Sequence, residues 1–423
     1  MSMHLTIEAF NTASVQHFLH GLENDLARRK SLLVLLPTNL QPAQIWDALQ
    51  ERLLRRGFDN IQTLDLNHMP VQGGLAGVVG KHLQVKWPAA HTPRTVANLL
   101  MCDSLPDIIR LEGLEQLPDA TKKTWLDLLQ QWAQAAQNTR ENISPTPLCI
   151  LAPAVSLLPD IPKTNVRLAV YWWWKVLSSL ELKLLCRFEN GESNAISLWR
   201  ENILPMLAGD DAALAEYLWD YLKLEPPDLM ERLRKFAQDR GWTIELLRAW
   251  KVEQFFSTKF YFNHGNASNP PESILSLWGH GVTHCTPEHG LELHTAALAL
   301  LGRKEDLLHR LWRGQTALLL PMINSLRLKI CEHLTKVYDN QWPIRWWQPE
   351  SPEEIRAVTN DPFACQWGHL RNLLNSCGNL QHERRWARLA DLSHRIRNEL
   401  AHYRPISFLD FELFWQELRK AAS

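Results

Sequence analysis

The chain has 423 residues, 45 % of them hydrophobic, and its 45 basic and 46 acidic residues leave a formal net charge of −1. These values are typical of a soluble globular protein with two or three domains. A dedicated non-specific nucleic-acid binder usually carries a strong positive balance, so any contact with nucleic acid is expected at a local site.

The seven cysteines and the N-terminal sequence bear on the compartment. The cysteines are odd in number and include no Cys-x-x-Cys pair, which favours a reducing environment. The N-terminal sequence lacks the basic and apolar regions of a signal peptide, and no stretch approaches the roughly 18 apolar residues of a membrane span. We therefore expect a cytoplasmic protein without a membrane partner.

The first third of the chain alternates short apolar runs with helical patterns. Such a rhythm predicts an α/β domain with a parallel sheet over residues 1–165. The expected strands are 32–36, 61–66, 108–111 and 148–151, and the expected helices are 42–56 and 119–137.

This order resembles the core of AAA-like or STAND-like P-loop ATPases. The resemblance implies that Glu112 and Glu115, at the end of the third strand, hold magnesium and polarise water. The segment after Leu36 has no Gly-Lys-Ser/Thr, however, which would wrap phosphates in backbone N–H groups and a Lys. We predict a degenerate nucleotide-binding fold, kept for protein contacts and without a cofactor.

From residue 166 onward the pattern becomes helical, and we assign residues 166–300 to a helical middle domain. The run Tyr171-Trp172-Trp173-Trp174 is expected to open a strongly apolar helix whose Trp side chains form buried core between domains. The 19 Trp of the chain mostly occur in helical patterns with Leu, which favours core and interface packing over base stacking.

A cluster of histidines and one cysteine in the middle domain could form a metal site. The cluster comprises His280, His284, Cys285, His289 and His294. Zinc accepts imidazole and thiolate ligands, but this spacing matches no standard structural zinc site. We predict no metal; the alternative to a site is a set of solvated or capping histidines between two helices.

The C-terminal part, residues 301–423, carries the most specific motif. An amphipathic helix is predicted from apolar positions recurring at threes and fours, at Trp386, Leu389, Ser393, Ile396 and Leu400. The run from Arg397 to His402 lies at the end of that helix and reads Arg-Asn-Glu-Leu-Ala-His.

This run resembles the active-site motif of HEPN ribonucleases, in which two helical bundles pair across an interface. RNA cleavage without metal uses the neighbouring 2′-hydroxyl as nucleophile, so a group titrating near neutral pH must move protons and a permanent cation must stabilise the phosphorane. His402 suits the proton transfer. Arg397 suits the stabilisation of the phosphorane, because the planar guanidinium fork of an arginine matches phosphate oxygens. Asn398 would orient the imidazole or bond a phosphate oxygen.

The resemblance extends over residues 305 to 420. The run Trp312-Arg313-Gly314-Gln315 and the Leu318–Arg327 segment are similar to the first long HEPN helix, and Gly368-His369-Leu370 is similar to the second. Two other Arg–His pairs, Arg303 with His309 and Arg388 with His394, lack the full motif and are set aside as incidental.

A local basic patch supports contact with RNA. Seven Arg lie between Arg371 and Arg404 against three acidic residues, so we expect Arg388, Arg395 and Arg404 to bind RNA. At about 100° per residue, Arg397 and His402 lie roughly 140° apart around a helix. They would therefore converge only if the helix ends near Ala401, or if a second protomer supplies partners.

Together these patterns predict an α+β multidomain protein that is mainly α: a degenerate P-loop-like α/β domain, a helical middle and a C-terminal HEPN bundle. The predicted function is metal-independent endoribonuclease activity that leaves 2′,3′-cyclic phosphate ends. The family resemblance implies a homodimer acting as a toxin or anti-phage defence effector, with an antitoxin or sensor as partner. The alternatives are a non-catalytic HEPN adaptor that dimerises and recruits a partner, and an ATP-driven switch.

Overall fold

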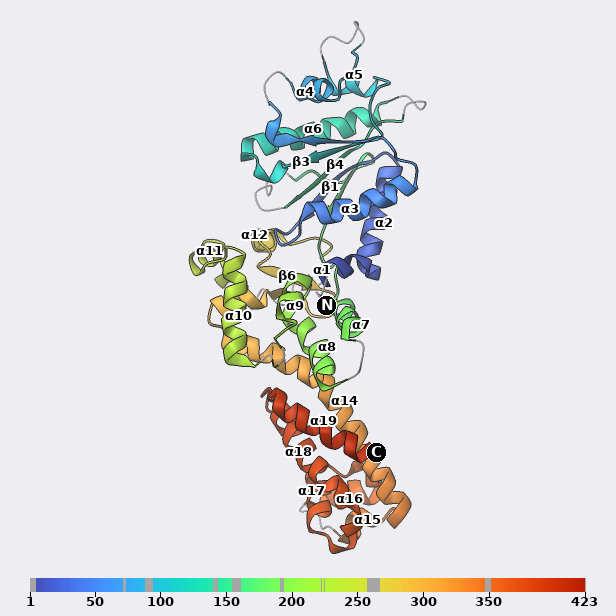
Figure 1. Ribbon diagram of the computed structural model, residues 1–423, viewed down its shortest axis with the longest axis vertical. Coiled ribbons are helices and arrows are strands. Elements are labelled where there is room, and N and C mark those ends of the chain that lie inside the picture. The colour runs from blue at the N-terminus through green and yellow to red at the C-terminus, as the bar shows by residue number, and fades with distance from the viewer. Residues whose placement is uncertain are drawn as a thin grey trace.

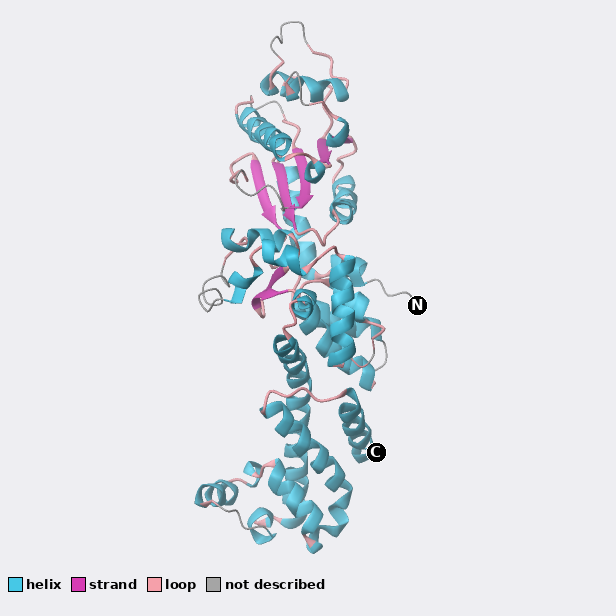
Figure 2. Cartoon of the chain, turned by 90° about the vertical axis from the view of Figure 1, so that its left-hand side faces the viewer, coloured by secondary structure: helices cyan, strands magenta, loops and turns pink. Residues whose placement is uncertain are grey.

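The structure is a computed structural model, and its parts follow one another in chain order along the long axis of the molecule (Figure 1). It describes residues 5–70, 74–87, 94–139, 144–153, 161–190, 194–221, 223, 225–256, 267–346 and 351–422. The described residues are mainly helical, with a five-stranded parallel sheet in the N-terminal part and a two-stranded hairpin in the middle. Figure 2 shows both groups of strands within the upper and central parts of the molecule. No helix among the described residues is both long and apolar enough to span a membrane.

The sheet has the strand order β2-β3-β4-β1-β5, and every neighbouring pair is parallel. Its strands are β1 Ser31–Leu36, β2 Ile61–Asp65, β3 Ile108–Glu112, β4 Leu148–Pro153 and β5 Leu168–Trp172. Strand β1 lies inside the sheet and all six of its residues are buried, which explains its unbroken apolar sequence. The four strands expected in this region are confirmed.

Helices cover both faces of this sheet. Figure 1 shows α2 and α3 on one side and α4, α5 and α6 on the other. The helices of this part are α1 Leu5–Glu8, α2 Ala13–Ala27, α3 Pro42–Arg55, α4 Leu75–His82, α5 Val96–Leu100 and α6 Asp119–Gln137. The expected helices 42–56 and 119–137 are therefore confirmed as α3 and α6. Trp125 and Trp132 of α6 are fully buried, as an amphipathic helix on a sheet requires.

The end predicted for the α/β domain, residue 165, is too early. Strand β5 pairs with β1 from Ser31 opposite Leu168 to Leu35 opposite Trp172. The Tyr-Trp-Trp-Trp run therefore does not open a helix: its first two residues finish an edge strand, and the next helix begins at Ser179. Trp173 and Trp174 are buried, as expected for core between domains. An edge strand with aromatic residues and an apolar helix have similar sequences, and only pairing with β1 separates them.

The middle part consists of short helices around the hairpin. Its elements are α7 Ser179–Asn190, α8 Ala195–Ala208, α9 Ala212–Leu218, α10 Pro226–Asp239, α11 Ile244–Ala249, α12 Leu275–Gly279, β6 Thr283–Thr286, β7 Gly290–Leu293 and α13 Thr295–Leu300. The middle part contacts the sheet domain through Trp278 of α12, whose ring centroid lies 5.5 Å from that of Trp172 in β5, and through polar groups. Thr6 of α1 donates to Glu216 of α9 from its backbone nitrogen, at 3.0 Å, and from its hydroxyl, at 2.7 Å.

One long helix joins the middle part to the C-terminal bundle. The bundle contains α14 Lys304–Tyr338, α15 Trp342–Trp346, α16 Pro352–Asn360, α17 Trp367–Ser376, α18 Ala387–Ala401 and α19 Phe408–Ala422, with a 3₁₀ segment at Gly378–Trp386. A Cβ at Gly314 of α14 would lie 2.8 Å from the carbonyl oxygen of Asn202, so only glycine allows this close approach to α8. Trp199 of α8 also stacks on Phe411 of α19, with ring centroids 5.1 Å apart.

Candidate active site at the end of helix α18

Helix α18 presents the predicted catalytic residues at its C-terminal end. Leu389, Ser393, Ile396 and Leu400 are buried, which confirms four positions of the predicted amphipathic face; the fifth, Trp386, is half-buried and precedes the helix as its N-cap residue. The helix ends at Ala401, and His402 is its C-cap residue. The end is closed by backbone bonds from Tyr403 to Leu400 and from Arg404 to Glu399, the pattern of a Schellman motif.

Tyr403 occupies the position of that motif where glycine is usual. Its φ is +58°, a left-handed conformation that costs a non-glycine residue roughly 1–2 kcal/mol. The ring of Tyr403 packs on Trp312, with centroids 4.7 Å apart, although 67 % of the residue is exposed. Trp312 also donates from its indole nitrogen to the carbonyl oxygen of Leu400, at 2.7 Å. Helix α14 thus fixes the turn that carries His402.

A buried glutamine of α14 fixes the chain just beyond the turn. Gln315 is 2 % exposed; its amide nitrogen donates to the carbonyl oxygen of Ile406 at 2.9 Å, and its amide oxygen accepts from the Ile406 nitrogen at 2.8 Å. The motif residues Trp312, Gly314 and Gln315 therefore all position the end of α18 or the helices around it.

Arg397 and His402 are both exposed, and Asn398 is half-buried. The helix ends near Ala401, as convergence of Arg397 and His402 requires, yet no hydrogen bond joins these two side chains among the described residues. Asn398 lies 3.2 Å from the ring of His394, not against His402, and its oxygen accepts from Arg397 Nη1 at 3.2 Å. Arg397 has no carboxylate partner within the described part of the chain, so its charge is available to a phosphate.

The three Arg predicted to bind RNA each have a carboxylate nearby. Arg395 lies 2.5 Å from Asp410, Arg388 lies 3.5 Å from Glu417, and Arg404 lies 3.7 Å from Glu399. Two of these acids come from α19, outside the window in which the Arg excess was counted. The packing of α19 on α18 thus makes the patch less positive than the local sequence indicates. All three Arg remain exposed, and exposed ion pairs of this kind contribute at most about 1 kcal/mol.

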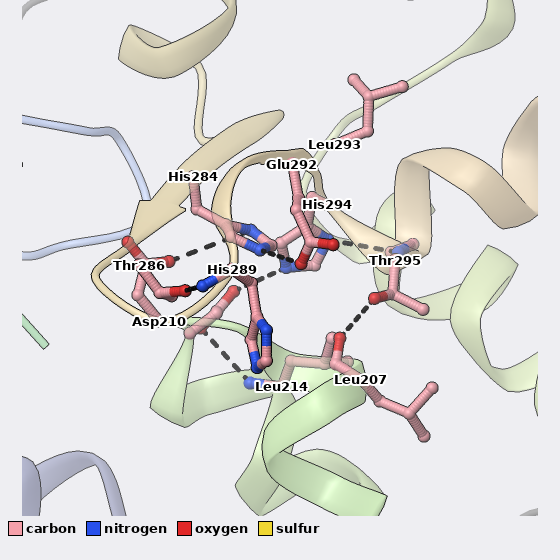
Figure 3. A network of polar contacts seen from close by, with 12 residues as sticks. Leu207, Asp210, Leu214, His284, Thr286, His289, Glu292, Leu293, His294 and Thr295 are labelled. Atoms are coloured by element: carbon pink, nitrogen blue, oxygen red, sulfur yellow. Dashed lines mark hydrogen bonds and ion pairs between the residues drawn. The ribbon is translucent and has the colours of Figure 1, made fainter. Parts of the chain in front are cut away.

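Three histidines of this cluster, His284, His289 and His294, lie in a polar network of the middle part (Figure 3). His284 of β6 is 3 % exposed and lies between two carboxylates, with Nδ1 4.0 Å from Asp210 and Nε2 3.8 Å from Glu292. His294 caps α13: its Nδ1 accepts from the Ala296 nitrogen, while its Nε2 lies 2.9 Å from Asp211. Burial lowers the pKa of His294 to about 4, against a smaller opposing effect of Asp211.

The rings of His284 and His294 meet edge to face, with centroids 6.1 Å apart, but each imidazole has its own carboxylate neighbours. His280 stacks on Trp250 with centroids 3.8 Å apart, and the described residues include no group of three His, Cys, Asp or Glu able to hold a metal ion. The expectation of a capping histidine is confirmed at His294. The expectation of solvated histidines between two helices is wrong for His284, which is buried and lies on strand β6. The segment forms the hairpin β6–β7 instead of a helix, because Gly281 and Gly290 adopt φ values of +69° and +71°.

The loop between β1 and α3 lies where a phosphate loop would be expected. The Thr38 nitrogen in this loop donates to the carbonyl oxygen of Gly279 in the middle part, at 2.8 Å, and Pro42 removes a donor from the first turn of α3. Glu112 forms an ion pair with Arg110, whose guanidinium lies 4.5 Å from the ring centroid of Trp46.

Two cavities flank this loop. The one that reaches Asn39, Trp173 and Trp278 has a volume of about 30 Å³. The other, beside Glu112 and Glu115, has about 320 Å³ and lies at the carboxyl ends of β2, β3 and β4. Sites for small molecules usually enclose roughly 300–1,000 Å³, so only the second has a suitable size.

No family model, no curated protein and no solved structure matches this chain. The sequence did not identify His394 as part of the candidate site, because the Arg388 and His394 pair lacks the Arg-Asn-x-x-Ala-His motif. A spacing signal was present: His394, Asn398 and His402 follow one another at intervals of four, which places them along one ridge of a helix.

Proposed function

We propose that the C-terminal bundle is a metal-independent endoribonuclease of HEPN type. The observation that carries this proposal is the end of α18, where the exposed Arg397, which has no carboxylate partner among the described residues, lies five residues before the exposed His402. The neighbouring Arg388, Arg395 and Arg404 have such partners, so Arg397 is the cation of this group best suited to a phosphate.

In this reaction the 2′-oxygen forms a bond to phosphorus and the bond from phosphorus to the 5′-oxygen breaks. His402 accepts the proton of the 2′-hydroxyl, Arg397 stabilises the charge on the phosphorane oxygens, and the 5′-oxygen leaves with a proton from water. The products are a 2′,3′-cyclic phosphate and a 5′-hydroxyl. Arg388, Arg395 and Arg404 would contact the RNA backbone by exchanging their carboxylates for phosphates.

We further propose that the N-terminal domain is a degenerate P-loop-like fold that acts through protein contacts. The hydrogen bond from Thr38 to Gly279, the missing donor at Pro42 and the engagement of Glu112 by Arg110 support this reading over an ATP-driven switch. The resemblance of the C-terminal motif to HEPN ribonucleases supports a further proposal: a cytoplasmic toxin or anti-phage effector that forms a homodimer through its bundle and is restrained by an antitoxin or sensor.

The test is cleavage of total and transfer RNA by the purified full chain in EDTA, with product ends analysed. Wild type should give discrete fragments with 2′,3′-cyclic phosphate ends, and Arg397→Ala and His402→Ala should give none. His382→Ala is the matched control, because His382 is exposed on the 3₁₀ segment of the same bundle. Uncut RNA from folded wild-type protein would instead support the adaptor.

The adaptor and the nuclease also differ in cells. Expression of a nuclease should slow growth, and the slowing should disappear with His402→Ala. An adaptor should be indifferent to Arg397→Ala and His402→Ala when both variants fold. An ATP-driven switch would bind nucleotide and lose function on Glu112→Gln and Glu115→Gln, whereas the present proposal expects neither substitution to change RNA cleavage.

A further inference from the structure

A chain of hydrogen bonds on α18 connects a histidine outside the motif to the proposed active site. Arg397 Nη1 lies 3.2 Å from Asn398 Oδ1, and Asn398 Nδ2 lies 3.2 Å from His394 Nε2. A guanidinium can only donate, so the Asn398 oxygen must face Arg397 and its NH₂ group must face the imidazole. An NH₂ group also only donates. His394 Nε2 must therefore be unprotonated, with the ring proton on Nδ1.

The surroundings of His394 favour this neutral form. The ring packs on α17, where a Cβ at Gly368 would lie 3.5 Å from its Cε1 atom. The charged groups that face it are Arg371 from α17 and Asp391 and Arg397 from α18. Burial, followed by the charges of Arg371 and Arg397, lowers the pKa of His394 against an opposing effect of Asp391.

Asp391 is itself engaged, which limits its ability to attract a proton to His394. Its Oδ1 accepts from Arg371 Nε at 2.9 Å and from Asn375 Nδ2 at 3.2 Å. The imidazole of His394 thus faces two guanidinium groups and a carboxylate that is already bonded. These surroundings favour the neutral ring that its hydrogen bond with Asn398 requires.

We propose that His394 is a positioning residue: by accepting from the Asn398 amide it fixes the orientation of that amide, which in turn holds the Arg397 guanidinium for the scissile phosphate. This inference rests on the proposed nuclease function and assigns to that site a control by protonation. A protonated His394 would present an N–H to the NH₂ group of Asn398. The amide would then rotate, and its NH₂ group would face Arg397 in place of the oxygen.

The activity test compares two substitutions of His394 in the full chain. His394→Gln supplies an acceptor oxygen near the Nε2 position, and His394→Leu supplies none. Losing a hydrogen bond that orients a charged group should lower kcat roughly ten- to hundredfold in His394→Leu, with little change in KM. His394→Gln should stay near wild type and should lose a component of the acid limb of its pH profile, because Gln does not titrate. His382→Leu is the control.

The results that overturn the proposal are specific. Wild-type cleavage by His394→Leu would remove the positioning role, and equal losses in His394→Leu and His394→Gln would show that ring shape rather than an acceptor matters. A pH profile of His394→Gln identical to that of wild type would remove the control by protonation.

A second measurement does not depend on activity. The ¹³C shifts of the His394 ring, assigned by comparison with His394→Gln, distinguish its two neutral tautomers and its charged form. The Nδ1–H tautomer at pH 7 is expected, and an Nε2–H or charged ring overturns the proposal. If wild type cuts no RNA, the proposed function fails alone, and the tautomer still decides whether the hydrogen-bonded chain exists.

Discussion

Replacing Gln315 with Leu should loosen the segment that follows His402. The substitution removes the bonding partner of both the N–H and the C=O group of Ile406, a residue that is 8 % exposed. Each buried backbone group left without a partner costs roughly 1–3 kcal/mol, and the added apolar contact of Leu offsets a part. We expect the local opening free energy to fall by about 3 kcal/mol.

Hydrogen exchange measured by mass spectrometry on the full chain tests this value. At about 1.4 kcal/mol for each factor of ten, the Ile406 amide in a peptide spanning residues 402–410 should exchange roughly a hundredfold faster. Gln381→Leu changes an exposed glutamine of the same bundle and should leave this peptide unaltered. An acceleration below about fivefold in Gln315→Leu would refute the reasoning, because it would mean that backbone alternatives satisfy Ile406 at little cost.

Three further predictions concern the buried network of the middle part. Gly209→Ala should lower the free energy of unfolding, measured in urea, by roughly 2–4 kcal/mol, because Gly209 has φ +66° and an added Cβ would overlap His284. Gly241→Ala is the control: Gly241 has φ +73° but open space around it, so this substitution should cost only about 1 kcal/mol. Burial raises the pKa of Asp210 to about 6, so the charged carboxylate destabilises the fold. Asp210→Asn should therefore raise the free energy of unfolding more at pH 7.5 than at pH 4.5, by roughly 2–3 kcal/mol. Equal effects at both pH values would contradict this prediction. His294 has a pKa of about 4 in the fold, so it stays neutral over a pH range in which the unfolded chain binds a proton at this residue. Its contribution to the free energy of unfolding should therefore be lost as the pH falls from about 6.5 to 4. In urea unfolding measured over this pH range, His294→Gln should lose less stability than wild type.

Local pattern determined much of the architecture. The unbroken apolar run of β1 and the threes and fours of α18 are signals that burial imposes on a sequence, and both elements lie where the pattern predicts them. The Arg-Asn-x-x-Ala-His run likewise gave the candidate residues and the end of their helix, because Pro405 and the last apolar position bound it.

Contacts distant in sequence decided the rest. The edge strand β5 is recognisable only by its pairing with β1, and the hairpin β6–β7 only by its glycine conformations. The basic patch gained its counter-charges from α19, which no local count includes. Likewise, the lowered pKa of His394 depends on burial and on the charge of Arg371 from α17, and the segment after His402 is held by Gln315, which lies 91 residues before Ile406. Hydrogen bonding and desolvation act between neighbours in space, so a sequence that fixes its helices and strands leaves these energies to the packing.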